Sequence, residues 1–359
     1  MSKKRLIILI VSICAIVGLV FGCLYFNSQM DKPLGPSLKG DSGDSTEQST
    51  SSSDQPSTPD LVSTPVQGSP QDQTGQPQPL CGNTPVLTVL AIGIDYRGDN
   101  YLYGLADVIR IVRIDFTQHK VSVLTLDRAI WVEIPGIADH YGITHGMLNQ
   151  AYFYGVPAMG YYDGSGGGAG LLAATLKKNF DLEVDNYVVV DFGAFVKVVD
   201  ALGGIDVFLP EPVDDLKPKG SSDTYFSAGA HHLTGAQALA LARVRAKYST
   251  LIRDRNQDII IKAIYDKISS PDVIVKIPKL LQALKGAGLT DLSPRQIENM
   301  VCLFKKMNSA NLSLVGIPDQ YYVYSWIYSQ ELHQDINVWD IDFDVFRSYI
   351  SQFMSGQWP

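Results

Sequence analysis

Short apolar runs alternate with amphipathic segments along most of the chain beyond residue 85. Runs rich in branched residues and bounded by polar or glycine positions are typical of strands, and an apolar stripe at helical spacing predicts a helix. The predicted strands are Val86–Ile94, Val108–Asp115, Val121–Leu126, Tyr187–Val190 and Gly204–Leu209, and the predicted helices are Leu171–Phe180 and Phe192–Ala201. This rhythm predicts a layered α/β domain in which helices cover a sheet.

The pattern changes after Thr234, which caps a predicted helix that runs to about Leu241. Arg243 and Arg245 then flank Val244, and residues two apart share a side only in an extended strand. We therefore expect a short strand that turns both guanidinium groups the same way.

Two more helices and a mixed segment complete the predicted elements. Asp254–Ile268 has apolar residues at helical spacing, with Arg253 and Gln257 at its N-terminal end. Ser293–Gln296 combines a capping box with proline at the first helical position and therefore begins another helix. The segment after Asn311 is aromatic and mixed, and we expect it to pack on the domain.

The N-terminus has the pattern of a membrane anchor. Met1–Arg5 carries three positive charges, and Leu6–Phe26 then runs about 20 residues without a charge, which is long enough to cross the hydrocarbon core of a bilayer. We predict a single-pass transmembrane helix in the cell membrane, with the N-terminus in the cytoplasm and the rest of the chain outside. A cleavable signal peptide and lipid attachment at Cys23 are the alternatives.

Composition divides the rest of the chain. Residues 27–85 are dominated by serine, threonine, glutamine, proline, aspartate and glycine, and this composition buries too little apolar surface to fold. The predicted organisation is a tail and anchor over 1–26, a disordered linker over 27–85, a folded domain over 86–270, and a C-terminal helical extension packed on that domain over 271–359.

The charge balance argues against nucleic acid as a partner. The chain of 359 residues has a net charge of -8. That charge is spread along the chain and leaves no basic patch, whereas phosphate backbones bind concentrated lysine and arginine.

The four cysteines divide by location. Cys14 and Cys23 lie in or at the predicted anchor. Cys81 and Cys302 both lie in the predicted extracytoplasmic part, where they form either a disulfide or two free thiols.

Charged residues stand at the edges of several apolar runs, where side chains meet a cleft. Two carboxylates and five guanidinium groups that one pocket could gather suit a divalent cation holding a polyphosphate. These residues are Asp95, Arg97, Asp107, Arg128, Arg243, Arg245 and Arg253. Taken alone, the aspartates are more typical of turns or helix caps, and the arginines of ion pairs across a sheet.

Several sequence blocks in a fixed order resemble the LytR-CpsA-Psr family over roughly residues 86 to 270, and the predicted anchor and tether match the layout of that family. The blocks are LTVLAIGIDYR, LADVIRIVRID, VSVLTLDR with WVEIPG, LNQAYFYG, VVVDFGAFVKVVDALGGIDV, LTGAQALALARVR and the R-x-x-x-Q of Arg253 to Gln257. The resemblance implies an α-β-α arrangement around a mixed central sheet. It also implies an envelope phosphotransferase that moves a glycopolymer from a polyprenyl pyrophosphate carrier to peptidoglycan as a phosphodiester, with release of polyprenyl phosphate.

The resemblance also assigns roles to single residues. It implies that Asp95 and Asp107 are ligands of Mg²⁺. The implied catalytic residues are Asp107, Arg128, Arg243 and Arg245. The residues implied to bind the substrate pyrophosphate are Arg97, Arg128, Arg243, Arg245, Arg253 and Gln257. The glycopolymer, whether teichoic acid, capsule or another wall polymer, stays open.

The chain departs from the family pattern at four positions. Ala129 stands where an acidic residue commonly follows the arginine, and Met147 where a lysine or arginine is common. Asn256 replaces the second arginine of an R-x-x-R-Q block, and Thr250 replaces an upstream aspartate. These changes leave turnover open, so the alternatives are a non-catalytic envelope module that binds prenyl pyrophosphate glycans and a structural envelope protein.

Overall fold

A six-stranded sheet forms the centre of the computed structural model, which describes residues 29–39, 78–96, 104–140, 142–214, 225–244, 250–270, 288–329 and 332–359. The strand order is β11-β6-β1-β2-β3-β12. The strands are β1 (Val86–Ile94), β2 (Ala106–Asp115), β3 (Lys120–Leu126), β6 (Asn186–Val190), β11 (Gly288–Thr290) and β12 (Leu312–Gly316). Because β6 is parallel to β1 and β12 to β3 while the other neighbours are antiparallel, the sheet is mixed.

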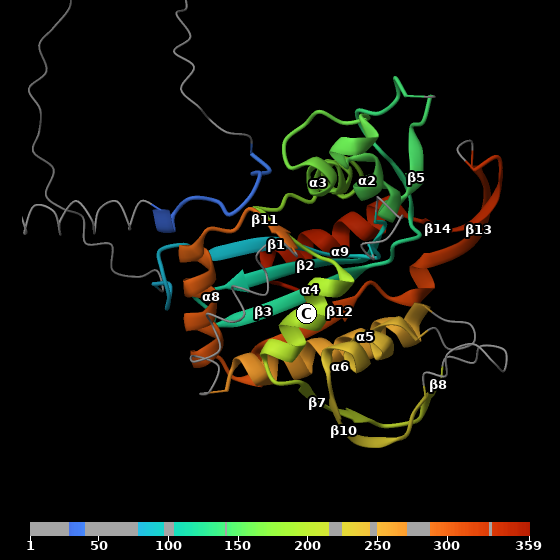
Figure 1. The fold of residues 1–359 in the computed structure, drawn as a ribbon. Coiled ribbons are helices and arrows are strands. Elements are labelled where there is room, and N and C mark those ends of the chain that lie inside the picture. Colours follow the sequence, from blue (N-terminus) through green and yellow to red (C-terminus); the bar gives the residue numbers. More distant parts are fainter. Residues whose placement is uncertain are drawn as a thin grey trace, which may run out of the picture.

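Helices cover both faces of this sheet (Figure 1). The helices α2 (Leu148–Tyr154), α3 (Gly167–Phe180) and α9 (Phe343–Ser355) pack on one face, and α6 (Thr250–Ile268) and α8 (Pro294–Lys306) pack on the other. The alternation of side chains along β1 explains the two layers, because Leu90 and Ile92 belong to the first core and Leu87 and Val89 to the second. The structure thus has the expected α/β fold with helices on both sides of a mixed sheet.

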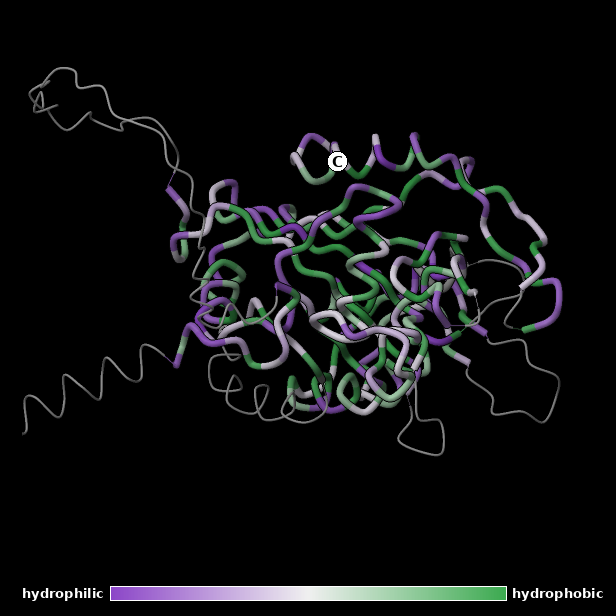
Figure 2. Tube along the Cα trace, turned by 90° about the horizontal axis from the view of Figure 1, so that it is seen from above, coloured by the Kyte–Doolittle hydropathy of each residue, from purple (hydrophilic) through white to green (hydrophobic). Residues whose placement is uncertain are grey.

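A third apolar cluster joins α4 (Phe192–Ala201), α5 (Gly235–Arg243) and α6 to a ribbon of β7 (Ile205–Leu209) and β10 (Gly229–Leu233). The smaller ribbons are β4 (Trp131–Glu133) with β5 (His145–Met147), β8 (Val213–Asp214) with β9 (Tyr225–Phe226), and β13 (Tyr322–Ser329) with β14 (Gln334–Ile341). Figure 2 shows the hydrophobic segments gathered in the interior of the molecule.

Most predicted elements are confirmed, but one is wrong at its end. β1 and α4 have the predicted bounds, and α8 begins after the predicted capping box. Arg243, however, is the last residue of α5 and not part of a strand. The capping box of Thr234 and Gln237 starts a helix that continues through Arg243, so extended backbone begins only at Val244. Arg245 lies outside the described residues.

The prediction of a helical extension over residues 271–359 is also wrong. Within this segment β11 and β12 form the two edges of the central sheet, and β13 and β14 form a hairpin, besides the helices α8 and α9. Residues 86–270 therefore do not complete the sheet by themselves. Edge strands of three and five residues are too short to give a clear alternation in the sequence.

Part of the predicted linker lies against the domain. The Leu34 amide donates to the Leu292 carbonyl at 3.2 Å, and the Leu38 amide donates to the buried carboxylate of Asp291 at 3.2 Å. The bonds that attach this segment are donated by its backbone amides, which every sequence has. The amino-acid composition of the segment therefore did not indicate the contact. No helix in the described ranges is long and apolar enough to span a membrane, and the predicted anchor over 1–26 lies outside those ranges.

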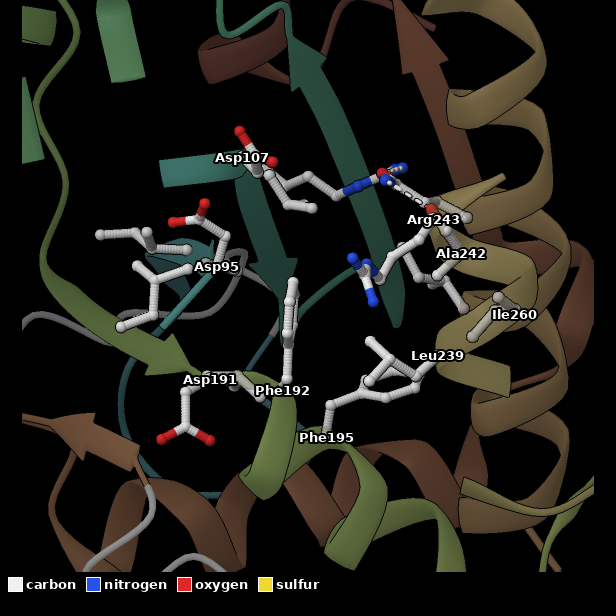
Figure 3. A pocket seen from close by; sticks show the side chains of 18 of the residues that line it. Asp95, Asp107, Asp191, Phe192, Phe195, Leu239, Ala242, Arg243 and Ile260 are labelled. Atoms are coloured by element: carbon white, nitrogen blue, oxygen red, sulfur yellow. Dashed lines mark hydrogen bonds between the residues drawn. The ribbon is translucent and has the colours of Figure 1, made fainter. Parts of the chain in front are cut away.

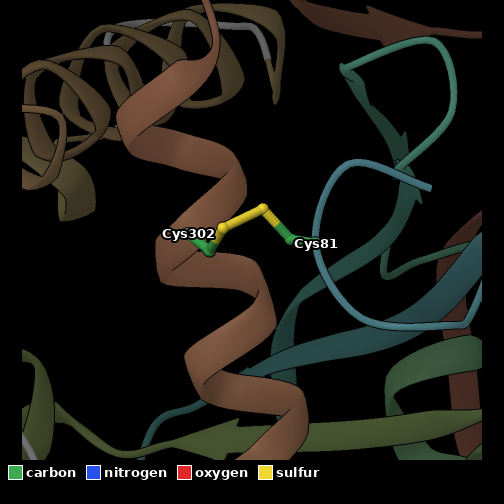
Figure 4. The surroundings of a disulfide bond; sticks show 2 residues. All are labelled: Cys81 and Cys302. Atoms are coloured by element: carbon green, nitrogen blue, oxygen red, sulfur yellow. A yellow bond between two sulfur atoms is a disulfide. The ribbon is translucent and has the colours of Figure 1, made fainter.

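A disulfide joins Cys81 to Cys302, which settles the alternative that the sequence left open (Figure 4). Cys81 lies in the loop that precedes β1, and Cys302 lies in α8, with the two Cα atoms 6.0 Å apart. The bond closes a separation of 221 residues and ties the start of the folded region to a helix that covers the sheet.

Candidate active site

A cavity of about 630 Å³ lies between the central sheet and the helices α4, α5 and α6. Five of the eight predicted site residues line it, namely Asp95, Asp107, Arg128, Arg243 and Gln257. Arg97 and Arg245 lie outside the described residues, and Arg253 falls in α6 with its side chain outside the described part. The structure thus brings together all the predicted site residues whose side chains it describes.

The two aspartates meet at an irregularity between β1 and β2. Gly93 pairs with Val108 but Ile94 pairs with Ala106, so Asp107 is an extra residue in the ladder. Such a bulge changes the direction in which a side chain points. The Asp95 carboxylate accepts a hydrogen bond of 2.7 Å from the Leu105 amide. These backbone contacts fix both carboxylates at one end of the cavity (Figure 3).

Arg128 lies two residues after the end of β3 and forms an ion pair with Asp107. The Asp127 carboxylate accepts a hydrogen bond of 2.8 Å from the Ala129 amide, and the Arg128 carbonyl accepts one of 3.1 Å from the Asn149 amide. These bonds hold the turn that carries the arginine. The Arg128 side chain is 24% exposed, so a ligand in the cavity can still reach its guanidinium group.

Arg110 is a cavity residue that the sequence reasoning missed. Its side chain is only 3% exposed, and it donates to Asp258 at 2.7 Å and to Gln257 at 3.3 Å. Within the described part of the chain, its Nε has no hydrogen-bond partner. The available signal was an arginine inside the apolar run of β2, three residues after Asp107.

Arg243 faces the middle of the cavity from the end of α5 (Figure 3). Its guanidinium carbon lies 4.8 Å from the centroid of the Phe192 ring, a cation–π contact that fixes the side chain without using its N–H donors. Phe192 is the first residue of α4, and the preceding Asp191 caps this helix by accepting a 2.6 Å hydrogen bond from the Ala194 amide. The donors of Arg243 are therefore directed toward the cavity.

The end of the cavity away from Asp107 is apolar apart from Asp191, whose carboxylate caps α4. Phe195, Leu239 and Ile260 line it in Figure 3, and further apolar residues of β6 and α6 complete the wall. Charge at one end and apolar surface at the other fit an amphipathic ligand with an anionic head.

The donor set at the charged end fits Mg²⁺. Mg²⁺ in phosphate sites takes one or two protein carboxylates and completes its coordination with phosphate oxygens and water. Asp95 and Asp107 supply two carboxylates at one end of the cavity. No group of three or more histidine, cysteine, aspartate or glutamate side chains forms a metal site among the described residues, so an all-protein metal cage is not found there. Mg²⁺ binding by Asp95 and Asp107 stays a prediction.

Comparison with known proteins agrees with the fold and with the sequence blocks. A family model described as the LytR_cpsA_psr family matches residues 41–339. The chain belongs to this family. The resemblance inferred from the sequence is therefore confirmed, and the match extends well beyond residue 270, in agreement with the C-terminal strands of the sheet.

Several named relatives are similar over part of the chain. Polyisoprenyl-teichoic acid–peptidoglycan teichoic acid transferase TagV of Bacillus subtilis (strain 168) is 30% identical over 199 residues, which cover 55% of this chain and 47% of TagV. Regulatory protein MsrR of Staphylococcus aureus (strain COL) is 28% identical over 207 residues, covering 57% of this chain and 56% of MsrR. The chain thus spans about half the length of these relatives.

Solved structures share the fold. The crystal structure of Bacillus subtilis TagV has a TM-score of 0.57 at 22% sequence identity and covers 75% of this chain and 97% of TagV. Protein gbs0355 of Streptococcus agalactiae has a TM-score of 0.59 at 19% identity, with 75% of this chain and 88% of that chain covered.

Proposed function

We propose that this protein transfers a glycopolymer from a polyprenyl pyrophosphate carrier to peptidoglycan, forming a phosphodiester link and releasing polyprenyl phosphate. The observation that carries the proposal is the division of the cavity into a charged and an apolar end. A polyprenyl pyrophosphate has the same division, because its anionic head joins a hydrocarbon chain. Relatives named as teichoic acid transferases, TagV and TagU, support the same reaction class.

In the proposed reaction, a hydroxyl oxygen of the acceptor sugar attacks the phosphorus that bears the glycopolymer. The new P–O bond forms as the bond from that phosphorus to the bridging oxygen breaks, and polyprenyl phosphate leaves with the bridging oxygen. The hydroxyl proton ends on the released phosphate or in solvent. Such phosphoryl transfers depend mainly on positioning and on charge stabilisation.

The arginines supply that stabilisation. Arg128 and Arg243 approach the cavity from β3 and α5, and forked guanidinium groups match phosphate oxygens bidentately. When bound, Mg²⁺ held by Asp95 and Asp107 would neutralise charge on the pyrophosphate oxygens. The negative charge of the leaving group, which spreads over several oxygens, would then be stabilised by these fixed positive groups.

We propose that Arg110 takes the place of the family arginine that is missing at Asn256. The R-x-x-R-Q block has lost its second arginine at Asn256, and the buried Arg110 brings a guanidinium group from β2 to the adjacent Gln257. Arg110 also lines the cavity, and its guanidinium group carries more N–H donors than the two that Asp258 and Gln257 accept. Arg110 in β2 thereby compensates for the arginine that is missing from α6 on the facing wall of the cavity.

We also assign residues 6–26 to a single membrane-spanning anchor with the N-terminus in the cytoplasm. The three basic residues before this uncharged run support that orientation. A carrier with a polyprenyl tail resides in a membrane, so an anchor keeps the domain near its substrate. Protease treatment of intact spheroplasts tests this: the C-terminal region should be cleaved in intact cells, and its protection would contradict the assignment.

The test uses the full-length protein in detergent with a polyprenyl pyrophosphate disaccharide, Mg²⁺ and peptidoglycan fragments, and measures released polyprenyl phosphate. Arg128→Ala should lower the rate about 10²- to 10³-fold, as removal of one electrostatic donor does in other enzymes. The matched control is Arg255→Ala, since Arg255 is an exposed residue of α6 that pairs with Glu211 outside the cavity. Equal rates for Arg128→Ala and wild type would contradict the proposal. Carrier bound tightly but never cleaved by the wild type would instead indicate a binding module.

A further inference from the structure

The outer face of the β13–β14 hairpin is unusually aromatic. Tyr324, Trp326 and Tyr328 alternate along β13 and are 59%, 63% and 57% exposed. In the register of the hairpin, Asn337 lies opposite Trp326 and Asp335 lies opposite Tyr328. Directly opposed residues share a face, so rings and polar groups stand side by side on one exposed surface. The other face packs inward through the buried Ile336 and Val338.

The charge near this surface argues against an anionic membrane as its partner. Residues 307–346 contain no lysine or arginine, while six carboxylates fall among them: Asp319, Glu331, Asp335, Asp340, Asp342 and Asp344. Anionic lipid surfaces and phosphate-bearing polymers repel such a segment. The charge therefore favours a partner without negative charge that offers both apolar faces and hydrogen-bonding groups.

The hairpin is joined to the candidate active site. The Trp339 amide donates to the Ala129 carbonyl at 3.0 Å, and Ala129 is the neighbour of Arg128. A second cavity of about 280 Å³ lies where Tyr328 and Ser329 meet the ribbon of β4 and β5. Trp131, His145 and Gln150 line this second cavity, which supplies another aromatic wall and further polar groups. Tyr328 thus belongs both to the aromatic face and to this cavity, and Trp131 in the cavity wall follows the Arg128 turn by three residues.

We propose that the outer face of β13–β14 and the adjoining cavity bind the acceptor, namely the uncharged backbone of a sugar strand. Pyranose rings present C–H groups on their faces, and these pack on exposed aromatic rings, while hydroxyl and acetamido groups bond to amides and carboxylates such as Asn337 and Asp335. Side chains two apart on a strand are about 7 Å apart, so successive rings are spaced on the scale of a sugar unit. Naming this ligand as the acceptor rests on the proposed function, whereas the binding itself does not.

The experiment measures binding of an uncharged β-1,4-linked N-acetylglucosamine hexamer to the full-length protein by titration calorimetry and tryptophan fluorescence. Trp326→Ala should weaken binding about tenfold, because the loss of one stacked ring costs on the order of one decade in affinity. Phe208→Ala is the matched control, since Phe208 is another exposed aromatic residue, 68% exposed, on β7 away from the hairpin. It should bind like the wild type. Both residues lie on the surface, so both variants should fold.

Equal hexamer affinity for Trp326→Ala and wild type, or no binding to the wild type, would overturn the inference. So would a Trp326-dependent affinity for vesicles of anionic phospholipid in place of the hexamer. The two proposals can fail separately. Carrier cleavage without hexamer binding would contradict only the proposed acceptor surface. Trp326-dependent hexamer binding without carrier cleavage would contradict only the proposed transferase function. If both hold, Trp326→Ala should raise the KM for peptidoglycan fragments and leave the kcat unchanged.

Discussion

At the scale of single residues, the site depends on charges that the fold holds in fixed positions. Asp95, Asp107 and Arg128 could be predicted because each stands at the end of an apolar run, where strands meet a cleft. Arg110 could not be predicted, because alternate residues of a strand face opposite sides and an arginine there normally faces solvent. Its partner Asp258 is 148 residues away in the sequence, so only the folded chain reveals the pair.

Replacing Arg110 tests whether it compensates for Asn256. Arg110→Met should lower kcat/KM for the polyprenyl pyrophosphate substrate by about 10²-fold, since a buried guanidinium donor is lost from the cavity. Arg110→Lys should recover only part of this loss, because an ammonium group lacks the planar fork. Steady-state kinetics and a thermal melt of each variant provide the measurement. Full turnover in a folded Arg110→Met variant would show that Arg110 is only structural.

A second charged pair, away from the cavity, links stability to pH. Asp115 is buried, which disfavours its charged form, but hydrogen bonds from Gln118 and Thr117 and the nearby Arg113 guanidinium outweigh burial and lower its pKa. A lowered pKa stabilises the fold above the unfolded value near 3.9, and this contribution is lost as the pH falls through the folded value.

We therefore expect the wild type to lose more unfolding free energy between about pH 6 and about pH 3 than Asp115→Asn loses. Urea unfolding of both proteins at the two pH values measures the difference. Parallel losses in the two proteins would contradict the assignment to Asp115.

At the scale of elements, local pattern determined the long strands and helices but not the pieces that complete them. β1 and α4 have strong periodicity and appeared with their predicted bounds. β11 and β12 are short edge strands whose place depends on pairing with β6 and β3, far away in the sequence. The segment around Leu34 and Leu38 likewise depends on partners that its own composition does not indicate.

The disulfide links the loop before β1 to α8, and its contribution to the free energy of unfolding can be measured directly. Replacing both Cys81 and Cys302 by serine should lower the unfolding free energy by about 2 to 5 kcal/mol, because the unfolded chain regains the freedom that the bond removes. Urea denaturation of the double variant and wild type gives the value. Neither cysteine lines the cavity, so the folded variant should keep wild-type kcat/KM. Unchanged stability, or lost activity in a fully folded variant, would contradict this account.

At the scale of the whole molecule, the cavity exists because separate units surround it. The central sheet carries Asp95, Asp107 and Arg128 at or just beyond the ends of its strands and Arg110 inside β2, while α4, α5 and α6 close the cavity with Arg243 and the apolar wall. The β13–β14 hairpin attaches to the Arg128 turn from outside. In this arrangement the proposed carrier would bind inside the cavity, and the proposed acceptor would approach over the hairpin.

The most direct test of the account is a ³¹P NMR spectrum of the reaction of full-length protein with polyprenyl pyrophosphate glycan, Mg²⁺ and peptidoglycan fragments. The pyrophosphate signals should disappear and be replaced by those of one phosphate monoester and one phosphodiester in equal amounts. Unchanged pyrophosphate signals, or two monoesters formed by hydrolysis in the presence of acceptor, would contradict glycopolymer transfer.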